Sequence, residues 1–310
     1  MLVGYSYDPI YARHDMGEGH PECPERVQLI DAHLRSIGLL EQLTSFSAKP
    51  AEREDVLLAH EESYVDRVFA LAPQARESVQ LDADTAMNEA SLPAVLMAVG
   101  AAIAAVNHVI DGRLNRAFCN IRPPGHHAES NRAMGFCIFN SIAVAARYAC
   151  MVRNLERIAI VDWDVHHGNG TEEILAGDSR VFMAHSFQSP LYPYSGVEAL
   201  GNNSCNMPLP PYSDGSKFRE RWTKEAIPAL EAFNPELILI SAGFDAHRDD
   251  PLAQLNWTEK DFTWATEQLH QLSLRTAAQG RIVSLLEGGY NLKALTLSVE
   301  AHIRGLLANQ

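Results

Sequence analysis

The stretch VDWDVHHGNG, residues 161–170, is the most informative part of this chain, because it follows directly on the apolar run RIAIV at 157–161. That run is rich in β-branched residues and predicts a buried strand. Asp164 and His166 come next, and in an extended chain side chains two residues apart leave the backbone on the same side. Both can therefore reach one metal ion. A loop whose Asp and His cap a following helix would explain this stretch equally well.

A second apolar strand, LILISAGF at 237–244, ends in Asp245 and favours the metal site. Open α/β sheets place their ligands at the carboxyl ends of strands, which is where Asp164 and Asp245 are expected. Together with His166 they form a suitable three-ligand set for a catalytic Zn²⁺, which binds nitrogen and oxygen ligands and keeps one position open for water.

Two further segments carry side chains of related chemistry. RPPGHH at 122–127 places adjacent histidines in a turn fixed by proline and glycine, and LLEGGY at 285–290 presents a tyrosine after two glycines. Taken alone, the first could be a hydrogen-bonded loop and the second a loop anchor. Four strand ends that all carry residues of metal-dependent hydrolysis make coincidence a poor explanation.

These segments resemble a known family. RPPGHHA, GFCIFN, DWDVHHGNGT, SAGFDAHRDDPL and LEGGY are similar, in order and spacing, to the zinc-dependent histone deacetylase and acetylpolyamine amidohydrolase superfamily. The resemblance runs from HPECPER at 20–26 to Tyr290, and the asparagine of HHGNG and the DPL at 250–252 look like its class II branch. It implies one arginase-like α/β domain over residues 1–310. Helices would flank a central, mainly parallel eight-stranded sheet whose carboxyl-edge loops shape a narrow tunnel.

Composition excludes several other classes of protein. A chain of 310 residues with 46% apolar residues suits a globular enzyme. Its net charge of −14 argues against direct binding to nucleic acid or an anionic membrane, although many proteins are acidic for solubility alone. Five cysteines without a CxxC pair predict no disulfide framework and a cytoplasmic location.

We also expect neither a signal peptide nor a membrane span. The most apolar stretch, 92–106, contains Pro93 and Gly100 and is typical of a buried helix.

Strand-like and helical patterns alternate along the chain, which predicts βαβ units in a single domain. The expected strands are 2–5, 117–119, 157–161, 181–184, 237–241 and 281–285. The expected helices include 25–37, 92–110, 139–151, 217–232 and 259–278. The stretch 186–216, rich in Gly, Pro, Asn and Ser, predicts long functional loops and is a candidate contact for a homo-oligomer that gates the tunnel.

The resemblance implies a role for each of these clusters. Asp164, His166 and Asp245 match the zinc ligands, with one ion per chain, and Fe²⁺ accepts the same ligand set. Tyr290 matches the tyrosine that donates a hydrogen bond to the substrate carbonyl and its oxyanion. Gly289, beside it, matches a residue of the substrate tunnel and lets the backbone come close to the metal.

His126 and His127 match tandem histidines that hold the attacking water. By the same match, Asp162 supports His126 and Asn169 supports His127. A carboxylate raises a histidine's pKa, whereas a neutral amide does little. We therefore expect His127 to be the better general base and then to protonate the leaving amine.

The tunnel walls and rim are matched more loosely. Phe136, after Gly135, matches one wall, and Tyr192 falls where most relatives have phenylalanine. Leu252 matches a rim position at which polyamine-selective relatives carry glutamate, and this tilts the prediction toward acyl-lysine. Asp84 lies near the family's acidic rim residue, and a solvated loop residue is the alternative.

Two further assignments concern the interior. Arg26 matches an arginine of a channel behind the metal, where it could handle acetate; a helix-surface ion pair is the alternative. The family also binds K⁺ through carbonyls around Asp162 together with a serine hydroxyl from the next strand. Met183 is the residue that the alignment places at the serine position, which puts the potassium site in doubt.

The sequence thus predicts a zinc-dependent amidohydrolase that removes an acetyl or other acyl group from an N-acylated amine, foremost acetyl-lysine of a protein or peptide. An acetylpolyamine or another small acyl amide is the alternative substrate. A non-catalytic acyl-lysine binding module would need a lost ligand or a lost Tyr290. An arginase-like dinuclear manganese enzyme would need more bridging carboxylates than Asp162, Asp164 and Asp245 supply.

Overall fold

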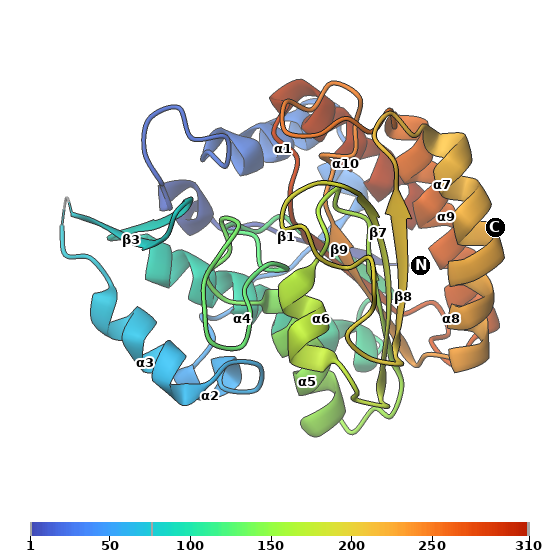
Figure 1. Cartoon of the computed structure of the whole chain (residues 1–310), viewed down its shortest axis with the longest axis horizontal. Coiled ribbons are helices and arrows are strands. Elements are labelled where there is room, and N and C mark those ends of the chain that lie inside the picture. The colour runs from blue at the N-terminus through green and yellow to red at the C-terminus, as the bar shows by residue number, and fades with distance from the viewer. Residues whose placement is uncertain (1, 76, 309–310) are drawn as a thin grey trace.

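A parallel eight-stranded sheet forms the centre of the computed structural model, which describes residues 2–75 and 77–308 (Figure 1). The strand order is β2-β1-β5-β10-β9-β6-β7-β8, and every neighbouring pair is parallel. The strands are β1 Val3–Ser6, β2 Thr44–Ser45, β5 Arg116–Cys119, β6 Ile158–Asp162, β7 Val181–Gln188, β8 Ser204–Leu209, β9 Leu237–Ala242 and β10 Ile282–Leu286. The predicted α/β fold is confirmed.

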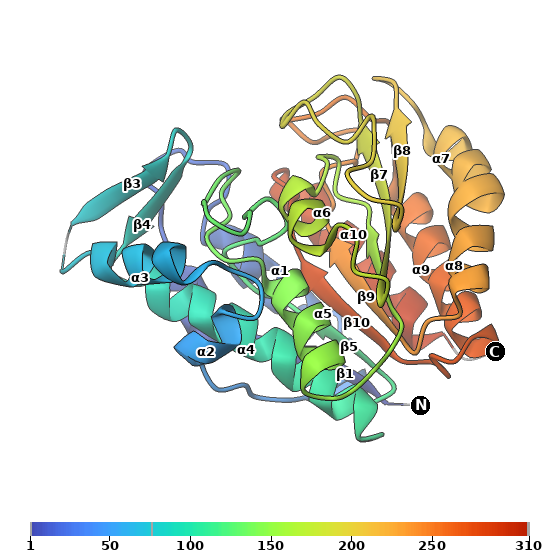
Figure 2. The same cartoon turned by 60° about the horizontal axis from the view of Figure 1, so that its bottom comes forward.

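Helices cover both faces of this sheet (Figures 1 and 2). On one face lie α2 (Arg53–Val56), α3 (Glu62–Leu71), α4 (Ser91–Ile110), α5 (Ser141–Met151) and α6 (Asn169–Leu175). On the other lie α1 (Glu25–Ser36), α7 (Gly215–Arg221), α8 (Ile227–Phe233), α9 (Glu259–Arg275) and α10 (Leu292–Leu307). Short 3-10 turns cover Pro9–Arg13 and Leu40–Gln42, and an antiparallel hairpin, β3 (Ser78–Asp82) with β4 (Thr85–Asn88), projects to one side.

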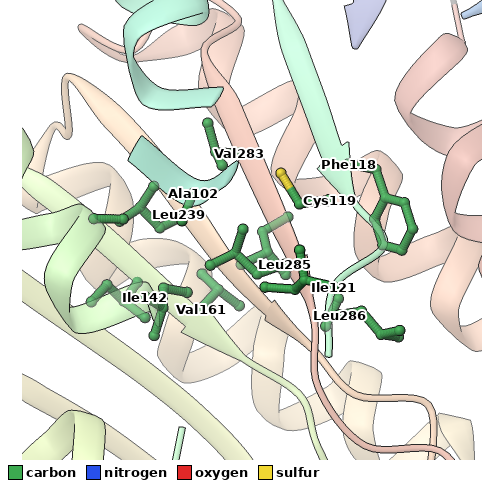
Figure 3. Close-up of a cluster of buried hydrophobic side chains, with 14 of the residues drawn as sticks. Ala102, Phe118, Cys119, Ile121, Ile142, Val161, Leu239, Val283, Leu285 and Leu286 are labelled. Carbon is green, nitrogen blue, oxygen red and sulfur yellow. The ribbon is translucent and has the colours of Figure 1, made fainter. Parts of the chain in front are cut away.

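The core forms because the central strands are apolar on both faces. Val161, Leu239 and Val283 are fully buried on neighbouring strands, and Figure 3 shows them with Ala102 of α4 and Ile142 of α5. Burying an apolar side chain of this size stabilises a fold by about 1.5–3 kcal/mol. Helices therefore pack on both faces of the strands whose ends carry the candidate site.

Helix α4 contains the apolar stretch 92–106 that the sequence predicted as a buried helix. Its mean hydropathy reaches 1.9 over an 18-residue window, so by length and composition alone it could cross a membrane. In the fold it packs against β5 and β10, with 56% of that window buried. Gly100 allows the backbone at Lys49 to pack closely against α4, because a Cβ at position 100 would lie 1.9 Å from the Lys49 carbonyl oxygen.

Two other segments differ from their predictions. The helix expected at 217–232 is interrupted by a π-helical turn at Trp222–Ala226, because Pro228 has no N–H to continue the helical ladder. The stretch 186–216, expected as long loops, contains the end of β7 and all of β8. Strand β8 is an edge strand that includes Pro208, and its mixed composition conceals it.

A buried histidine joins α10 to the sheet. The ring nitrogens of His302 lie 2.6 Å from Thr266 Oγ1 on α9 and 2.8 Å from Ser284 Oγ on β10. Burial lowers the pKa of His302 to about 3. The folded protein therefore holds this ring neutral.

We predict that acid destabilises the fold through this group. Between pH 6.5 and about 3 the unfolded chain binds a proton at His302 that the folded chain does not. The free energy of unfolding should therefore fall as pH drops below 6.5, by up to about 1.4 kcal/mol per pH unit. Urea unfolding at pH 7.5, 6.0 and 5.0 measures this. His302→Gln should give a shallower slope, and an equal slope would contradict the assignment.

Candidate active site

Four neighbouring strands bring the predicted residues together. Strands β5, β10, β9 and β6 are adjacent in the sheet and parallel, so their carboxyl ends meet at one edge. The histidine pair follows β5, the tyrosine follows β10, and the remaining polar groups follow β9 and β6. This is the position at which parallel sheets bind ligands.

Asp164, His166 and Asp245 are buried and form a cluster that could hold a metal ion, their ligand atoms lying within 4.8 Å of one another. His166 Nδ1 is 3.0 Å from Asp164 Oδ1 and 3.2 Å from Asp245 Oδ2. Asp245 Oδ2 has no well-aligned hydrogen-bond partner among the described residues. A buried carboxylate oxygen without a well-aligned donor fits a bound cation, and the mixed nitrogen and oxygen set suits zinc.

Backbone amides fix the two carboxylates from neighbouring loops. Gly288 N donates to Asp164 Oδ2 at 2.8 Å, and Val165 N donates to Asp245 Oδ1 at 2.8 Å. A Cβ at Gly288 would lie 2.1 Å from Asp245 Oδ2, so this close approach needs glycine. Burial, and then Asp164, raise the pKa of Asp245 to about 7. Two carboxylates this close in the interior favour a cation between them.

The histidine pair has two different supports. His126 Nδ1 lies 3.0 Å from Asp162 Oδ2, and His127 Nδ1 lies 2.7 Å from Asn169 Oδ1, as the sequence predicted. Burial lowers the pKa of His126, but Asp164 and Asp162 outweigh it and raise that pKa well above its usual value. Burial, and then the charges of His126 and His166, lower the pKa of His127 well below its usual range.

A buried glutamate that the sequence analysis did not assign holds this turn. Glu287 Oε2 accepts hydrogen bonds from Gly125 N at 2.7 Å and from His126 N at 3.2 Å. Burial raises the pKa of Glu287 to about 7. Glu287 lies in the same LEGGY segment that was singled out for its tyrosine, and a carboxylate after a buried strand was the available signal.

Tyr290 is fixed from two directions. Its backbone N donates to Asp250 Oδ2 at 2.7 Å, and the Arg26 guanidinium lies 5.1 Å from the centre of its ring. Burial, and then Asp245, raise the pKa of the Tyr290 hydroxyl well above its usual value, so it stays protonated and can donate. Asp250, which anchors this backbone, was also missed from the sequence.

Arg26 is an interior residue and not a helix-surface ion pair. It is fully buried, and its Nε donates to the Gly289 carbonyl at 2.7 Å. Its terminal nitrogens donate to Glu22 Oε1 at 2.8 Å and to the Glu287 carbonyl at 2.5 Å. These bonds hold the loop that carries Tyr290, while a role in acetate release stays a prediction.

A cavity of about 270 Å³ leads to these groups. The lining residues are Asp84, His127, Gly135, Phe136, His166, Leu191, Tyr192, Leu252 and Tyr290. Asp84, expected near the rim, is thus one of them, and lies between β3 and β4. Gly135 lets the chain pass close to His127, because a Cβ would lie 2.4 Å from its Cδ2. Gly289, which the resemblance placed in the tunnel, is not among these lining residues, and a Cβ there would meet Leu295 and Phe244.

Comparison with known proteins identifies the family. The histone deacetylase domain model matches residues 20–306. The chain belongs to the histone deacetylase family. The fold matches the crystal structure of the HDA15 HD domain with a TM-score of 0.92 and 31% identity, over 99% of this chain and 88% of that one.

Two curated relatives of this deacetylase family member bear related names. The histone deacetylase-like amidohydrolase of Pseudomonas aeruginosa is 37% identical over 88% of this chain and 73% of its own length. Histone deacetylase 5 of Arabidopsis thaliana is 34% identical over 99% of this chain but only 49% of its own length, so the chain spans about half of that protein. Family and site together make this chain a hydrolytic deacetylase.

The potassium site that the resemblance implies needs a serine hydroxyl from the strand next to Asp162, and the residue beside Asp162 is not a serine. Met183 pairs with Ile160 on β6, and His185 is the residue beside Asp162. His185 is buried with Nδ1 3.8 Å from Asp162 Oδ2, and neither ring nitrogen has a hydrogen-bond partner in the described chain. Neither the thioether of Met183 nor the imidazole of His185 supplies a hydroxyl oxygen, so neither can replace the serine that the resemblance implies.

We predict that the purified deacetylase binds about one zinc ion per chain. Asp245→Asn should lose most of it, because an amide oxygen is a neutral and weaker ligand. Plasma mass spectrometry after gel filtration measures the content. Asp249→Asn, the same change at a carboxylate that is 60% exposed, is the control and should retain zinc. Two ions per chain would instead favour a dinuclear site.

Proposed function

We propose that this deacetylase removes acetyl groups from lysine side chains of proteins or peptides, with Zn²⁺ held by Asp164, His166 and Asp245. The observation that carries this proposal is the cavity above the metal cluster. Phe136 and Tyr192 provide aromatic walls, and Leu252 gives the rim an apolar side chain. Such a tunnel suits the uncharged, extended stem of an acylated lysine.

The metal ion, when bound, would polarise the substrate carbonyl and lower the pKa of the attacking water. The chain's own residues then have separate roles. The Tyr290 hydroxyl donates a hydrogen bond to the carbonyl oxygen as negative charge develops there. Phe136 and Tyr192 position the stem and exclude other water.

The two histidines divide the work of proton transfer. His127, supported by a neutral amide and with a lowered pKa, can accept the water's proton at Nε2. It then returns that proton to the leaving amine. His126, supported by the Asp162 carboxylate and with a raised pKa, is suited to remain an imidazolium that orients the water by hydrogen bonding.

A second substrate class is favoured by one residue. Asp84 lines the same cavity, and a carboxylate there could pair with the second ammonium of an acetylated polyamine. The same carboxylate could equally accept N–H groups of a peptide backbone. A cytoplasmic location and a homo-oligomer remain predictions from the sequence alone.

We predict that Tyr290→Phe lowers kcat by about 10²–10³-fold on the preferred substrate, because one oxyanion donor is removed. The measurement is kcat/KM of the zinc-loaded protein on an acetyl-lysine peptide and, in parallel, on an acetylated polyamine. Higher kcat/KM for the peptide supports the proposal. Higher kcat/KM for the polyamine would overturn the substrate while leaving the chemistry in place.

The rim residue gives an independent prediction. Leu252→Glu should shift the ratio of kcat/KM toward the acetylated polyamine by about fivefold, the effect of one partly exposed ion pair. Leu252→Gln has the same size without the charge and serves as the control. An equal shift in both variants would show that shape, and not charge, selects the substrate at this position.

A further inference from the structure

A chain of hydrogen bonds leads from His127 to the protein surface. The Asn169 side chain places its Oδ1 2.7 Å from His127 Nδ1. The amide nitrogen of the same side chain donates to Glu129 Oε1 at 2.8 Å and faces Met134 Sδ at 3.3 Å. Both groups on the nitrogen side are acceptors. Asn169 therefore has one orientation in which all of its contacts are satisfied.

The orientation of this amide determines the tautomer of His127. An ionised carboxylate can only accept, so Glu129 must face the NH₂ group of Asn169. The amide oxygen of Asn169 must then face His127, and it can only accept a hydrogen bond there. Nδ1 of His127 consequently carries the hydrogen, which leaves Nε2 with a free lone pair on the ring that lines the substrate cavity.

Glu129 is itself held in place by an arginine. Arg132 donates from Nε to Oε2 at 2.7 Å and from a terminal nitrogen to Oε1 at 2.9 Å. The Glu129 side chain is 18% exposed and that of Arg132 is 60% exposed. These residues border a second cavity of about 420 Å³, which also touches Asn169 and Met134. The chain of hydrogen bonds thus connects the reacting ring to a charged pair outside the substrate cavity.

We propose that Glu129 is a positioning residue, which acts through Asn169 to keep the Nε2 atom of His127 free to accept a proton. The proposal rests on the proposed role of His127 as the general base. It assigns a function to a carboxylate that neither contacts the metal cluster nor lines the substrate cavity. The proposal requires that both hydrogen bonds run in the same direction. His127 Nδ1 donates to Asn169, and Asn169 donates to Glu129.

Exchanging the amide at position 169 and the carboxylate at position 129 tests the direction of these hydrogen bonds. Asn169→Asp alone places two carboxylates against each other at the 2.8 Å contact. Glu129→Gln alone introduces a side chain that can donate or accept, so the orientation of Asn169 is no longer fixed. The double variant combines both changes. Its new amide at position 129 can donate to the new carboxylate at position 169, which in turn accepts from His127, so a single direction is restored.

We expect kcat to fall about tenfold in Glu129→Gln and about 100-fold in Asn169→Asp, with KM little changed. The double variant should recover at least tenfold over Asn169→Asp, a coupling that independent sites do not show. Glu173→Gln is the matched control, because Glu173 lines the same second cavity but binds Ser130 and should leave kcat unchanged. Additive losses in the double variant would overturn the proposal.

A measurement without turnover separates this proposal from the proposed function. ¹⁵N NMR of histidine-labelled, zinc-loaded protein, with His127 assigned from His127→Ala, reports which ring nitrogen carries the hydrogen. We expect the hydrogen on Nδ1 in the original chain and in the double variant, and a mixture in Glu129→Gln. A hydrogen on Nε2 in the original chain would overturn the proposal whatever the substrate proves to be. Thermal melting checks that each variant is folded.

Discussion

The parallel pairing of β5, β10, β9 and β6 is the constraint on which the site depends. Their register places Cys119, Leu285, Ser241 and Asp162 level with one another across the sheet. Each strand therefore ends at the same height, and the first polar side chains beyond it fall within reach of the others. Residues as far apart in the sequence as His126 and Tyr290, which are 164 positions apart, meet because the sheet aligns the strands that precede them.

Buried carboxylates then tie the loops beyond that edge to one another. Asp164 accepts a hydrogen bond from the backbone N–H of Gly288. In the same way Glu287 accepts one from Gly125, and Asp250 accepts one from Tyr290. Burying a charge is costly unless donors satisfy it, so these bonds are conditions for the loops to pack at all. The same bonds hold the reacting groups in position before any substrate binds, which is how hydrogen bonding around a site contributes to catalysis.

Much of this arrangement could be predicted from the sequence, because it depends on short-range patterns. Asp164 and His166 follow a recognisable buried strand, and the supports of His126 and His127 followed from the resemblance to the family. Glu287 and Asp250 were missed because the local sequence does not show which distant backbone amide a carboxylate binds, even where, as at Glu287, the carboxylate follows a buried strand. That His185, and not Met183, lies beside Asp162 depends on strand register, which the sequence alone does not show. Strand β8 was missed because edge strands need little hydrophobic periodicity.

The two oxygens of Asp250 have a consequence for how this enzyme could evolve. One oxygen accepts the backbone N–H of Leu252 at 3.0 Å and the other accepts that of Tyr290 at 2.7 Å. Leu252, which lines the substrate cavity, and Tyr290, the proposed hydrogen-bond donor to the substrate carbonyl, are thus both fixed by a single side chain. Changes in substrate scope that move the entrance loop will carry changes in turnover with them. Adaptation to a new acyl donor would therefore proceed by paired substitutions rather than by independent single steps.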